Sequence, residues 1–396
     1  MMKHGLMFAV LTGFSACANA QTLTNLGVPP GWSKVFVRDL NDLGTVVVGY
    51  GESAAGERAF RWTSAGGFED VASAFGAAPS DAMGVSPNGV VVVGFFGEVT
   101  QERAFRWTSG SGMQNLGLLP GGLSAKADAV SGDMSVVVGY CLTSEGTRAF
   151  RWSSVGGMQD LGRLPGSFHA RAYDVSSNGA VIVGSSGGRA FRYTQHGGMV
   201  ALGRLPGQTE DSAIAHAVNS DGSAISGHSA GLAFRWTEQR GMHDLGRLPD
   251  RVQYSGFTIS GDGQTVGGIA WSQAHVPHGF LWRESIGMVS LKTYLDDLGV
   301  NTSGWNFQAV YGLSSDGRTL AGTGQLFGAQ RGFIVTGLPK ACRADMNGDG
   351  VLNIFDFIEF QNLFAAENFR ADFNYDGQFD IFDFLEFQNA FAAGCP

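Results

Sequence analysis

Short runs of β-branched residues, each ending in glycine, alternate with turn-forming residues throughout residues 21–339. The run VVVG at 46–49 and again at 136–139 is typical. Many of these runs follow a segment such as Ser-Pro-Asn-Gly at 86–89. Asn-Gly and Asp-Gly between apolar runs are strong signals for a tight turn between antiparallel strands. The pattern therefore predicts a succession of β-hairpins with type I′ turns.

The motif Ala-Phe-Arg-Trp and its close relatives mark a repeat that occurs seven times. The central phenylalanines lie 41 to 53 residues apart and are Phe60, Phe105, Phe150, Phe191, Phe234, Phe280 and Phe333. A Gly-Met-x-x-Leu-Gly segment follows most copies, so each unit holds four short strands in about 45 residues. A unit of this length and content is typical of a β-propeller blade.

The two ends of the array complement each other. The seventh unit stops after 333–335 and lacks its fourth strand, whereas residues 22–31 resemble the missing segment, as comparison with 114–121 shows. The first strand can thus complete the last blade and close the ring, which removes exposed sheet edges. We therefore predict an all-β, seven-bladed β-propeller over residues 21–339.

The motifs AFRW, GMxDLG and VSxDG, taken together, resemble the HAF-type repeats of bacterial secreted proteins over nearly all of residues 22–338. The segment 291–317 also looks like the closing segment of such arrays. The resemblance implies an extracellular propeller-like module, and this family brings no established chemistry to transfer. We expect the arginine and tryptophan of each AFRW motif to pack within the blades, with the arginine stem covering an aromatic ring.

Glycine accounts for 60 of the 396 residues, about twice its usual share, which suits a chain with many tight turns. The net charge is −9, and the chain has no long basic run, which argues against nucleic-acid binding. Residues 342–396 contain ten acidic and two basic residues, so nearly all of the negative charge lies at the C-terminus. This asymmetry predicts a second domain over residues 340–396.

The N-terminus is typical of an export signal. Lys3 precedes an apolar stretch at 5–14, and Ala18-Asn19-Ala20 provides a small-x-small cleavage site. We predict a signal peptide over 1–20, with cleavage after Ala20 and an extracellular or cell-surface location. Lipoprotein anchoring at Cys17 is the alternative. No later segment offers a membrane span, and we expect a monomer.

The acidic domain contains two copies of a 12-residue calcium loop. Ca²⁺ prefers six to eight oxygen ligands, and the glycine at position 6 of each copy permits a sharp turn. The first ligand set is Asp345, Asn347, Asp349, Val351 through its carbonyl, Asn353 and Asp356. The second is Asp372, Asn374, Asp376, Gln378 through its carbonyl, Asp380 and Asp383. We therefore predict that the domain binds two calcium ions.

Phenylalanines at helical spacing follow each loop, but no helix precedes the first loop, and position 12 is aspartate. This pattern resembles the dockerin, a duplicated calcium-dependent module that binds cohesin receptors, over about 342–396. The resemblance implies a small α-helical domain with a cohesin-like or other protein receptor as its partner.

In dockerins, positions 10 and 11 of each loop contribute to partner recognition. Here those positions are Ile354, Phe355, Ile381 and Phe382. Their identity in the two copies would permit binding in either orientation. They are apolar where the family usually has small polar residues, and the alternative interpretation places them in the core.

Cysteine usage fits an oxidising compartment. Cys342 and Cys395 bracket the acidic domain, and we predict a structural disulfide between them. A metal or redox pair is the alternative, but companion Cys or His residues at ligand spacing are missing. Cys141 is expected to be a small buried residue on a strand.

No catalytic constellation stands out, so the sequence favours a secreted, non-catalytic binding protein attached through a calcium-dependent docking module. Two alternatives remain. A carbohydrate-binding or carbohydrate-active propeller enzyme needs paired carboxylates across a cleft, and the repeats show none out of register. A structural cell-surface protein would use the C-terminal domain merely as a cap. Polysaccharide is a candidate ligand of the propeller, and the insertion at about 292–308, with Tyr294, Trp305 and Phe307, is either a ligand contact or a cap.

Overall fold

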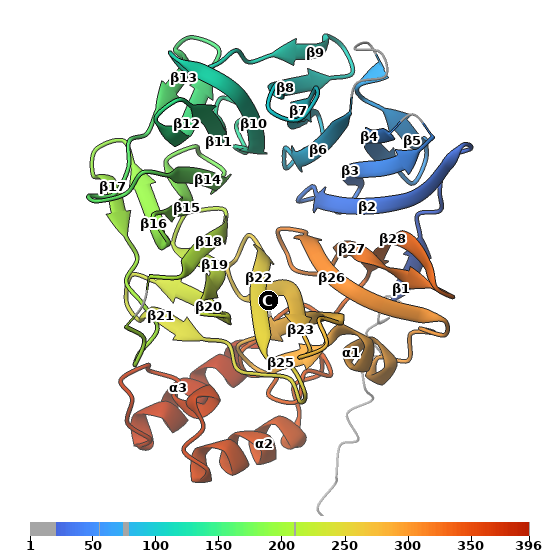
Figure 1. Ribbon diagram of the computed structural model, residues 1–396. Helices are drawn as coiled ribbons and strands as arrows, with labels where there is room; N and C mark the ends of the chain where they lie inside the picture. Colours follow the sequence, from blue (N-terminus) through green and yellow to red (C-terminus); the bar gives the residue numbers. More distant parts are fainter. Residues whose placement is uncertain (1–20, 55, 74–78, 210, 396) are drawn as a thin grey trace, which may run out of the picture.

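The computed structural model describes residues 21–395 apart from 55, 74–78 and 210. The expected signal peptide, including Cys17, lies outside the described residues. The chain forms seven four-stranded antiparallel sheets arranged around a central axis, followed by a small helical domain (Figure 1). No helix in the described part of the chain is long and apolar enough to cross a membrane. The all-β, seven-bladed propeller predicted from the repeats is confirmed.

Each blade contains four strands in consecutive order from the central axis outwards, except the last. Blades 1 and 2 consist of β2 (Trp32–Leu40), β3 (Val46–Ser53), β4 (Gly56–Thr63), β5 (Gly67–Asp70), and β6 (Ser80–Val85), β7 (Val91–Phe96), β8 (Arg103–Thr108), β9 (Gly112–Asn115). Blades 3 and 4 consist of β10 (Gly122–Val130), β11 (Val137–Thr143), β12 (Gly146–Ser153), β13 (Gly157–Asp160), and β14 (Ala170–Val175), β15 (Val181–Ser186), β16 (Arg189–Thr194), β17 (Gly198–Ala201). Blades 5 and 6 consist of β18 (Ala213–Val218), β19 (Ala224–Ser229), β20 (Leu232–Thr237), β21 (Gly241–Asp244), and β22 (Gln253–Ile259), β23 (Thr265–Trp271), β24 (Pro277–Arg283), β25 (Gly287–Ser290). Blade 7 consists of β26 (Trp305–Leu313), β27 (Leu320–Leu326), β28 (Ala329–Thr336) and β1 (Thr22–Asn25).

The first strand of the described chain completes the last blade, as the matching ends of the array predicted. β1 runs antiparallel to β28, with Thr22 opposite Thr336 and Asn25 opposite Phe333. Just beyond β1, Leu26 N donates a hydrogen bond to Gly332 O at 3.1 Å, and the Leu26 side chain is buried. Both ends of the propeller are therefore held in one sheet, and the ring is closed.

The turn between the first two strands of each blade differs from the sequence prediction. In blade 2, Gly89 N donates to Ser86 O at 2.7 Å, and positive φ falls on Gly89, the last residue of the turn. A type I′ turn would need positive φ at Pro87, which the proline ring forbids. The type I′ prediction is therefore wrong. Ser86 Oγ instead donates a hydrogen bond to Asn88 Oδ1 at 2.8 Å and accepts one from Val91 N. These two hydrogen bonds fix the turn.

The AFRW motif joins blades to one another. Its phenylalanine is completely buried in every blade, and Trp62, Trp107 and Trp152 are also buried, so the packing prediction is confirmed for these rings. The arginine has a more specific role than the predicted aromatic cover. Arg235 Nε donates to Gly263 O, in the turn of the next blade, at 2.8 Å. In blades 1 and 5 the arginine thus satisfies a carbonyl of the neighbouring blade.

The insertion before blade 7 packs into the core of the propeller. It forms the helix α1 (Leu291–Asp297) and the chain that leads into β26. Tyr294, Trp305 and Phe307 are buried, and Trp305 stacks on Phe307 with ring centroids 5.5 Å apart. The aromatic side chains of this segment are used in packing. The alternative, a cap, describes it better.

The C-terminal segment forms α2 (Ile354–Ala365), a short 3₁₀ helix η2 (Phe369–Ala371) and α3 (Ile381–Ala393). Phe360 and Phe387 stack at 4.3 Å between centroids and form the centre of a separate small core. The predicted disulfide between Cys342 and Cys395 is present, and Cys141 is buried on β11, as expected.

The small domain packs against blades 5 and 6, beside β21 and β25 (Figure 1). Arg370 Nε donates to Ser285 O, in the turn between β24 and β25, at 2.6 Å. The Arg240 guanidinium lies 4.3 Å from the centre of the Tyr375 ring and forms an ion pair with Glu284 at 2.9 Å. These contacts connect η2 and the second loop of the small domain to the propeller.

Replacing Leu26 with alanine tests the contribution of ring closure to stability. Because Leu26 is buried where β1 meets β28, we expect Leu26→Ala to lower the free energy of unfolding by about 2–4 kcal/mol in urea titrations. The control Leu43→Ala removes an exposed side chain, so we expect a change within about 0.5 kcal/mol. Equal effects of the two substitutions would contradict a stabilising role for the closing strand.

Candidate functional sites in the channel and the C-terminal loops

The innermost strand of every blade carries a bulge that turns one side chain toward the central channel. The register of each strand pair shifts around this residue, and all seven side chains are partly exposed. These residues are Arg38, Met83, Asp128, Tyr173, His216, Phe257 and Tyr311. The position is chemically different in almost every blade, although the strands around it repeat. The sequence interpretation missed this ring because it searched for repeated residues.

Aromatic side chains occupy the channel positions of blades 4 to 7. The rings of Tyr173 and His216 lie 5.5 Å apart, those of His216 and Phe257 5.0 Å, and those of Phe257 and Tyr311 5.2 Å. His216 Nε2 lies 3.1 Å from His228 Nδ1. Burial lowers the pKa of His216 to about 3, so its imidazole is neutral at neutral pH. This side of the channel is therefore a continuous, uncharged aromatic surface.

Charged side chains occupy the channel positions on the opposite side. Arg38 Nε donates to Asp81 Oδ2 at 3.0 Å. Asp128 faces Arg171 without forming an ion pair, and its Oδ2 is buried without a hydrogen-bond partner among the described residues. Burial raises the pKa of Asp128 to about 8, and Arg171, Lys126 and Arg38 partly offset this effect.

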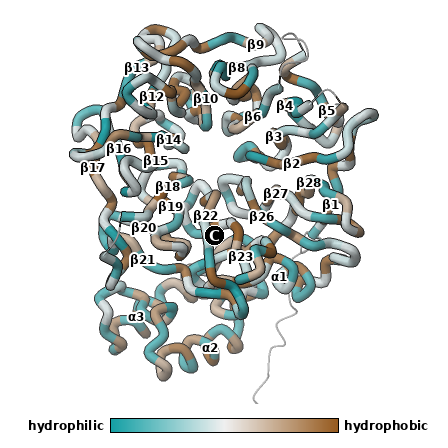
Figure 2. The backbone as a smooth tube through the Cα atoms, viewed as in Figure 1, coloured by the Kyte–Doolittle hydropathy of each residue, from teal (hydrophilic) through white to brown (hydrophobic). Residues whose placement is uncertain are grey.

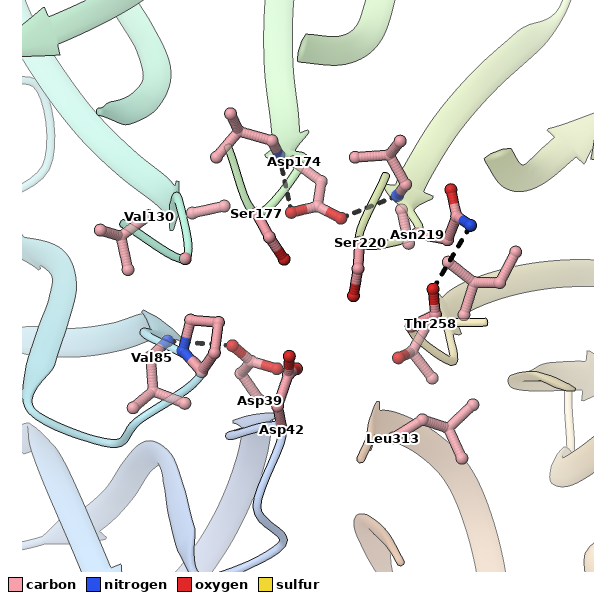
Figure 3. A pocket seen from close by; sticks show the side chains of 18 of the residues that line it. Asp39, Asp42, Val85, Val130, Asp174, Ser177, Asn219, Ser220, Thr258 and Leu313 are labelled. Atoms are coloured by element: carbon pink, nitrogen blue, oxygen red, sulfur yellow. Dashed lines mark hydrogen bonds between the residues drawn. The ribbon is translucent and has the colours of Figure 1, made fainter. Parts of the chain in front are cut away.

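The turns between the first and second strands of several blades surround one end of the channel (Figure 3). A cavity of about 100 Å³ there is lined by Asp39, Asp42 and Asp174, among others. Asp39 Oδ2 accepts a hydrogen bond from Val85 N of blade 2 at 2.9 Å, and Asp174 Oδ2 accepts one from Val218 N of blade 5 at 2.8 Å. Burial raises the pKa of Asp39 to about 8 and that of Asp174 to about 7. Asp39 and Asp174 therefore link neighbouring blades.

These carboxylates correct one statement made from the sequence, namely that the repeats contain no carboxylates out of register. Asp39 and Asp174 stand at the same strand position in blades 1 and 4, where blade 2 has Gly84 and blade 5 has Ala217. An alignment of the repeats on their bulges would have found them.

The C-terminal loops bury four of their predicted calcium ligands. Asp345 and Asp356 of the first loop and Asp372 and Asp383 of the second are all buried. None of the four forms an ion pair with Lys, Arg or His in the described part of the chain, and Asp372 Oδ1 has no hydrogen-bond partner there. Burial raises the pKa of Asp345. Burial of these carboxylates therefore costs free energy, and no protein cation in the described part of the chain compensates for it.

Both loops fold in the same way. Position 1 accepts from the glycine at position 6: Gly350 N donates to Asp345 Oδ2 at 2.9 Å, and Gly377 N to Asp372 Oδ2 at 3.1 Å. Position 12 accepts from position 9, where Asn353 N donates to Asp356 Oδ2 at 2.9 Å. The equivalent bond of the second loop, from position 9 to Asp383 Oδ2, is 3.0 Å long.

The remaining predicted ligands are arranged in the same duplicate manner. Asn347 and Asn374 donate through their amides to Asp349 and Asp376, while Asn353 and Asp380 cap the helices that follow. The carbonyl of Val351 accepts from the Asn353 amide, and Gln378 N donates to Asp376. Within the described residues, no three His, Cys, Asp or Glu side chains converge on one point. The predicted ligand sets depend in addition on asparagine and main-chain oxygens.

The four predicted recognition residues lie on the surface of the small domain. The exposed fractions of Ile354, Phe355, Ile381 and Phe382 are 61%, 64%, 60% and 59%. The interpretation that places these side chains in the core is therefore wrong. They stand at the first turns of α2 and α3, and each pair occupies the same position in its own copy.

No protein-family model matches the chain, and no curated protein matches it. An oligogalacturonate lyase from Vibrio parahaemolyticus has a TM-score of 0.53 at 8% identity, covering 79% of this chain and 93% of that one. The β-propeller domain of Cps50 (Swd1) from Myceliophteria thermophila has a TM-score of 0.49 at 10% identity, covering 79% and 99%. TolB from Acinetobacter baumannii has a TM-score of 0.43 at 13% identity, covering 78% of this chain, which spans 65% of the TolB chain. The likeness to the lyase supports the propeller fold and shows nothing about function.

The buried carboxyl of Asp128 makes stability depend on pH. Its pKa of about 8 lies above the usual value near 4, so the folded chain retains a proton that the unfolded chain releases. The contribution of this group to the stability of the folded chain is fully present below about pH 4 and is lost as the pH rises to about 8. Between pH 5 and pH 8.5, we expect the melting temperature of the wild type to fall by about 1–3 °C more than that of Asp128→Asn. The exposed Glu98→Gln is the control, and identical pH profiles for the wild type and Asp128→Asn would refute the assignment.

Proposed function

We propose that the chain is a secreted, non-catalytic binding protein whose propeller is attached to a receptor through a calcium-dependent, dockerin-like module. The observation that carries this proposal is the pair of equivalent loops with four buried carboxylates that lack ion-pair partners in the described chain. Buried charges in proteins are paired or bind metals. A divalent cation in each loop would compensate them.

The chemistry of the loops fits calcium better than a transition metal. Every predicted ligand offers oxygen, from carboxylates, asparagine amides or the carbonyls of Val351 and Gln378, and neither loop contains histidine or cysteine. Hard cations prefer such ligands, and calcium tolerates the irregular geometry of flexible loops. The bound ion would also offset repulsion between the carboxylates, so calcium and folding of this domain should be coupled.

The exposed apolar side chains at the starts of α2 and α3 are the proposed docking face. Figure 2 shows apolar stretches on both helices. Because Ile354-Phe355 and Ile381-Phe382 are equivalent in the two copies, either copy can present the same pair to a cohesin-like receptor. The disulfide between Cys342 and Cys395 suits the oxidising surroundings that the predicted export requires.

The two alternatives explain less. A carbohydrate-active enzyme needs paired carboxylates, and two of the channel carboxylates, Asp39 and Asp174, are occupied by main-chain donors of neighbouring blades. A structural surface protein with a mere cap does not account for four large apolar side chains that remain exposed after the cap has packed against the propeller.

Calcium titration of the chelator-stripped full chain tests the metal sites. We expect calorimetry to give two bound ions for the wild type and one for either Asp345→Ala or Asp372→Ala, because each variant lacks the position-1 carboxylate of one loop. The double variant should bind none. Glu386→Ala, which removes an exposed carboxylate of α3 outside the loops, should still bind two. Absence of binding heat, with melting unchanged by calcium, would contradict the proposal.

Substitutions on the docking face test the partner. Against purified, immobilised cohesin modules in calcium, we expect Ile354→Ser with Phe355→Ser, or Ile381→Ser with Phe382→Ser, to lower affinity by only about twofold, since one orientation remains. The quadruple variant should not bind, and chelator should release the wild type. Val155→Ser, at a still more exposed apolar residue of the propeller, is the control. If the chain binds calcium but no cohesin, the proposed metal sites stand and a cohesin-like receptor is refuted.

A further inference from the structure

The cleft between blades 4 and 5 departs from the packing that the two preceding blade contacts share. In blades 1 to 3, the residue after the central glycine of the second strand is aromatic, and a cation covers its ring. Lys126 of blade 3 lies 3.8 Å from the Phe95 centroid of blade 2, and Arg171 of blade 4 lies 4.6 Å from the Tyr140 centroid of blade 3. Tyr50 of blade 1 is instead covered by Arg38 of its own blade, at 5.0 Å. The pairs Lys126–Phe95 and Arg171–Tyr140 thus each span a blade contact, between blades 2 and 3 and between blades 3 and 4.

In blade 4 both parts of this packing unit are replaced. The aromatic position is Ser185, and the cation position of the next blade is Ile214, as the register of β14 with β15 and of β18 with β19 shows. The result is a hollow of about 530 Å³ between blades 4 and 5, lined by Tyr173, Ser185 and His228, among others. Its volume lies in the range of about 300–1,000 Å³ found for small-molecule sites.

The cleft combines ring faces with hydrogen-bonding groups. Tyr173 and His228 supply rings, and Arg171 and Ser185 supply polar groups. His228 Nδ1 lies 3.1 Å from both His216 Nε2 and Ser255 Oγ, whereas His228 Nε2 forms no hydrogen bond with the described residues. Burial lowers the pKa of His228, so its imidazole is neutral at neutral pH.

We propose that this cleft is the ligand site of the propeller and that it holds a sugar ring of a glycan. A pyranose ring presents C–H groups on its faces, which pack on aromatic rings, and hydroxyls around its edge, which exchange hydrogen bonds with guanidinium, imidazole and hydroxyl groups. The ring takes the place of the aromatic side chain that Ser185 lacks. A purely apolar ligand would make no use of the polar groups of Arg171, Ser185 and His228.

The site is independent of calcium-dependent docking, because none of its lining residues belongs to 340–396. It opens at the end of the blades where the β15–β16 loop lies, with Gly187 and Gly188 at its rim. The small domain contacts the opposite end, at the turn between β24 and β25. Both sites can therefore be occupied at once.

The decisive variant is Ser185→Tyr, which restores the residue of blades 1 and 3 and fills the cleft. Binding is measured by calorimetry on the full chain with cellotetraose, xylotetraose, trigalacturonate and inorganic phosphate. We expect the wild type to bind at least one of the oligosaccharides and Ser185→Tyr to bind none, with its melting temperature maintained. Ser185→Ala keeps the hollow and loses one hydroxyl, so its affinity should fall by less than about tenfold.

His228→Ala provides a second test that does not depend on filling the cleft. Loss of the imidazole ring and its free nitrogen should weaken oligosaccharide binding by at least about tenfold. The proposal is overturned if no oligosaccharide binds, if phosphate alone binds, if folded Ser185→Tyr binds like the wild type, or if His228→Ala leaves affinity unchanged.

Discussion

A four-stranded blade has two faces to bury and cannot cover either by itself, so the whole propeller depends on contacts between blades. The fully buried phenylalanine of each AFRW motif contributes the apolar part of these contacts. Arginines that reach a carbonyl of the next turn, and the carboxylates of Asp39 and Asp174 that accept main-chain hydrogen bonds from the next blade, contribute the polar part. The ring must close for every blade to have two neighbours, which is why β1 completes blade 7.

The contacts between blades determine which residue can stand at some positions and leave other positions free to vary. A Cβ added to Gly139 would lie 2.1 Å from Lys126 O, so the glycine at the centre of the second strand has no alternative. The bulged residue of each innermost strand points toward the channel and differs in almost every blade. Chemical variety is therefore confined to the channel and to clefts such as that beside Ser185, where a packing residue has been replaced.

The small domain follows a different principle. Its phenylalanine core is small, and its loops contain carboxylates that are buried among main-chain donors. Its position on blades 5 and 6, through Arg370 and Tyr375, leaves the starts of α2 and α3 uncovered. The proposed docking face and the proposed sugar cleft thus lie on parts of the molecule that do not compete, as a protein that connects a ligand to a receptor requires.

The sequence by itself determined the number of blades, the closing strand, the disulfide and the two loop–helix units, because each rests on spacing within one repeat or on a match between two segments. Only the tertiary structure decided how Tyr294, Trp305 and Phe307 are used, that Ile354 and Phe355 are exposed, and which side chains surround the channel. These features depend on residues from different blades or domains that meet in space. The cleft at Ser185 shows the physical reason. Nothing in the sequence marks a serine on a strand, and a hollow forms there only because the neighbouring blade places Ile214 against it.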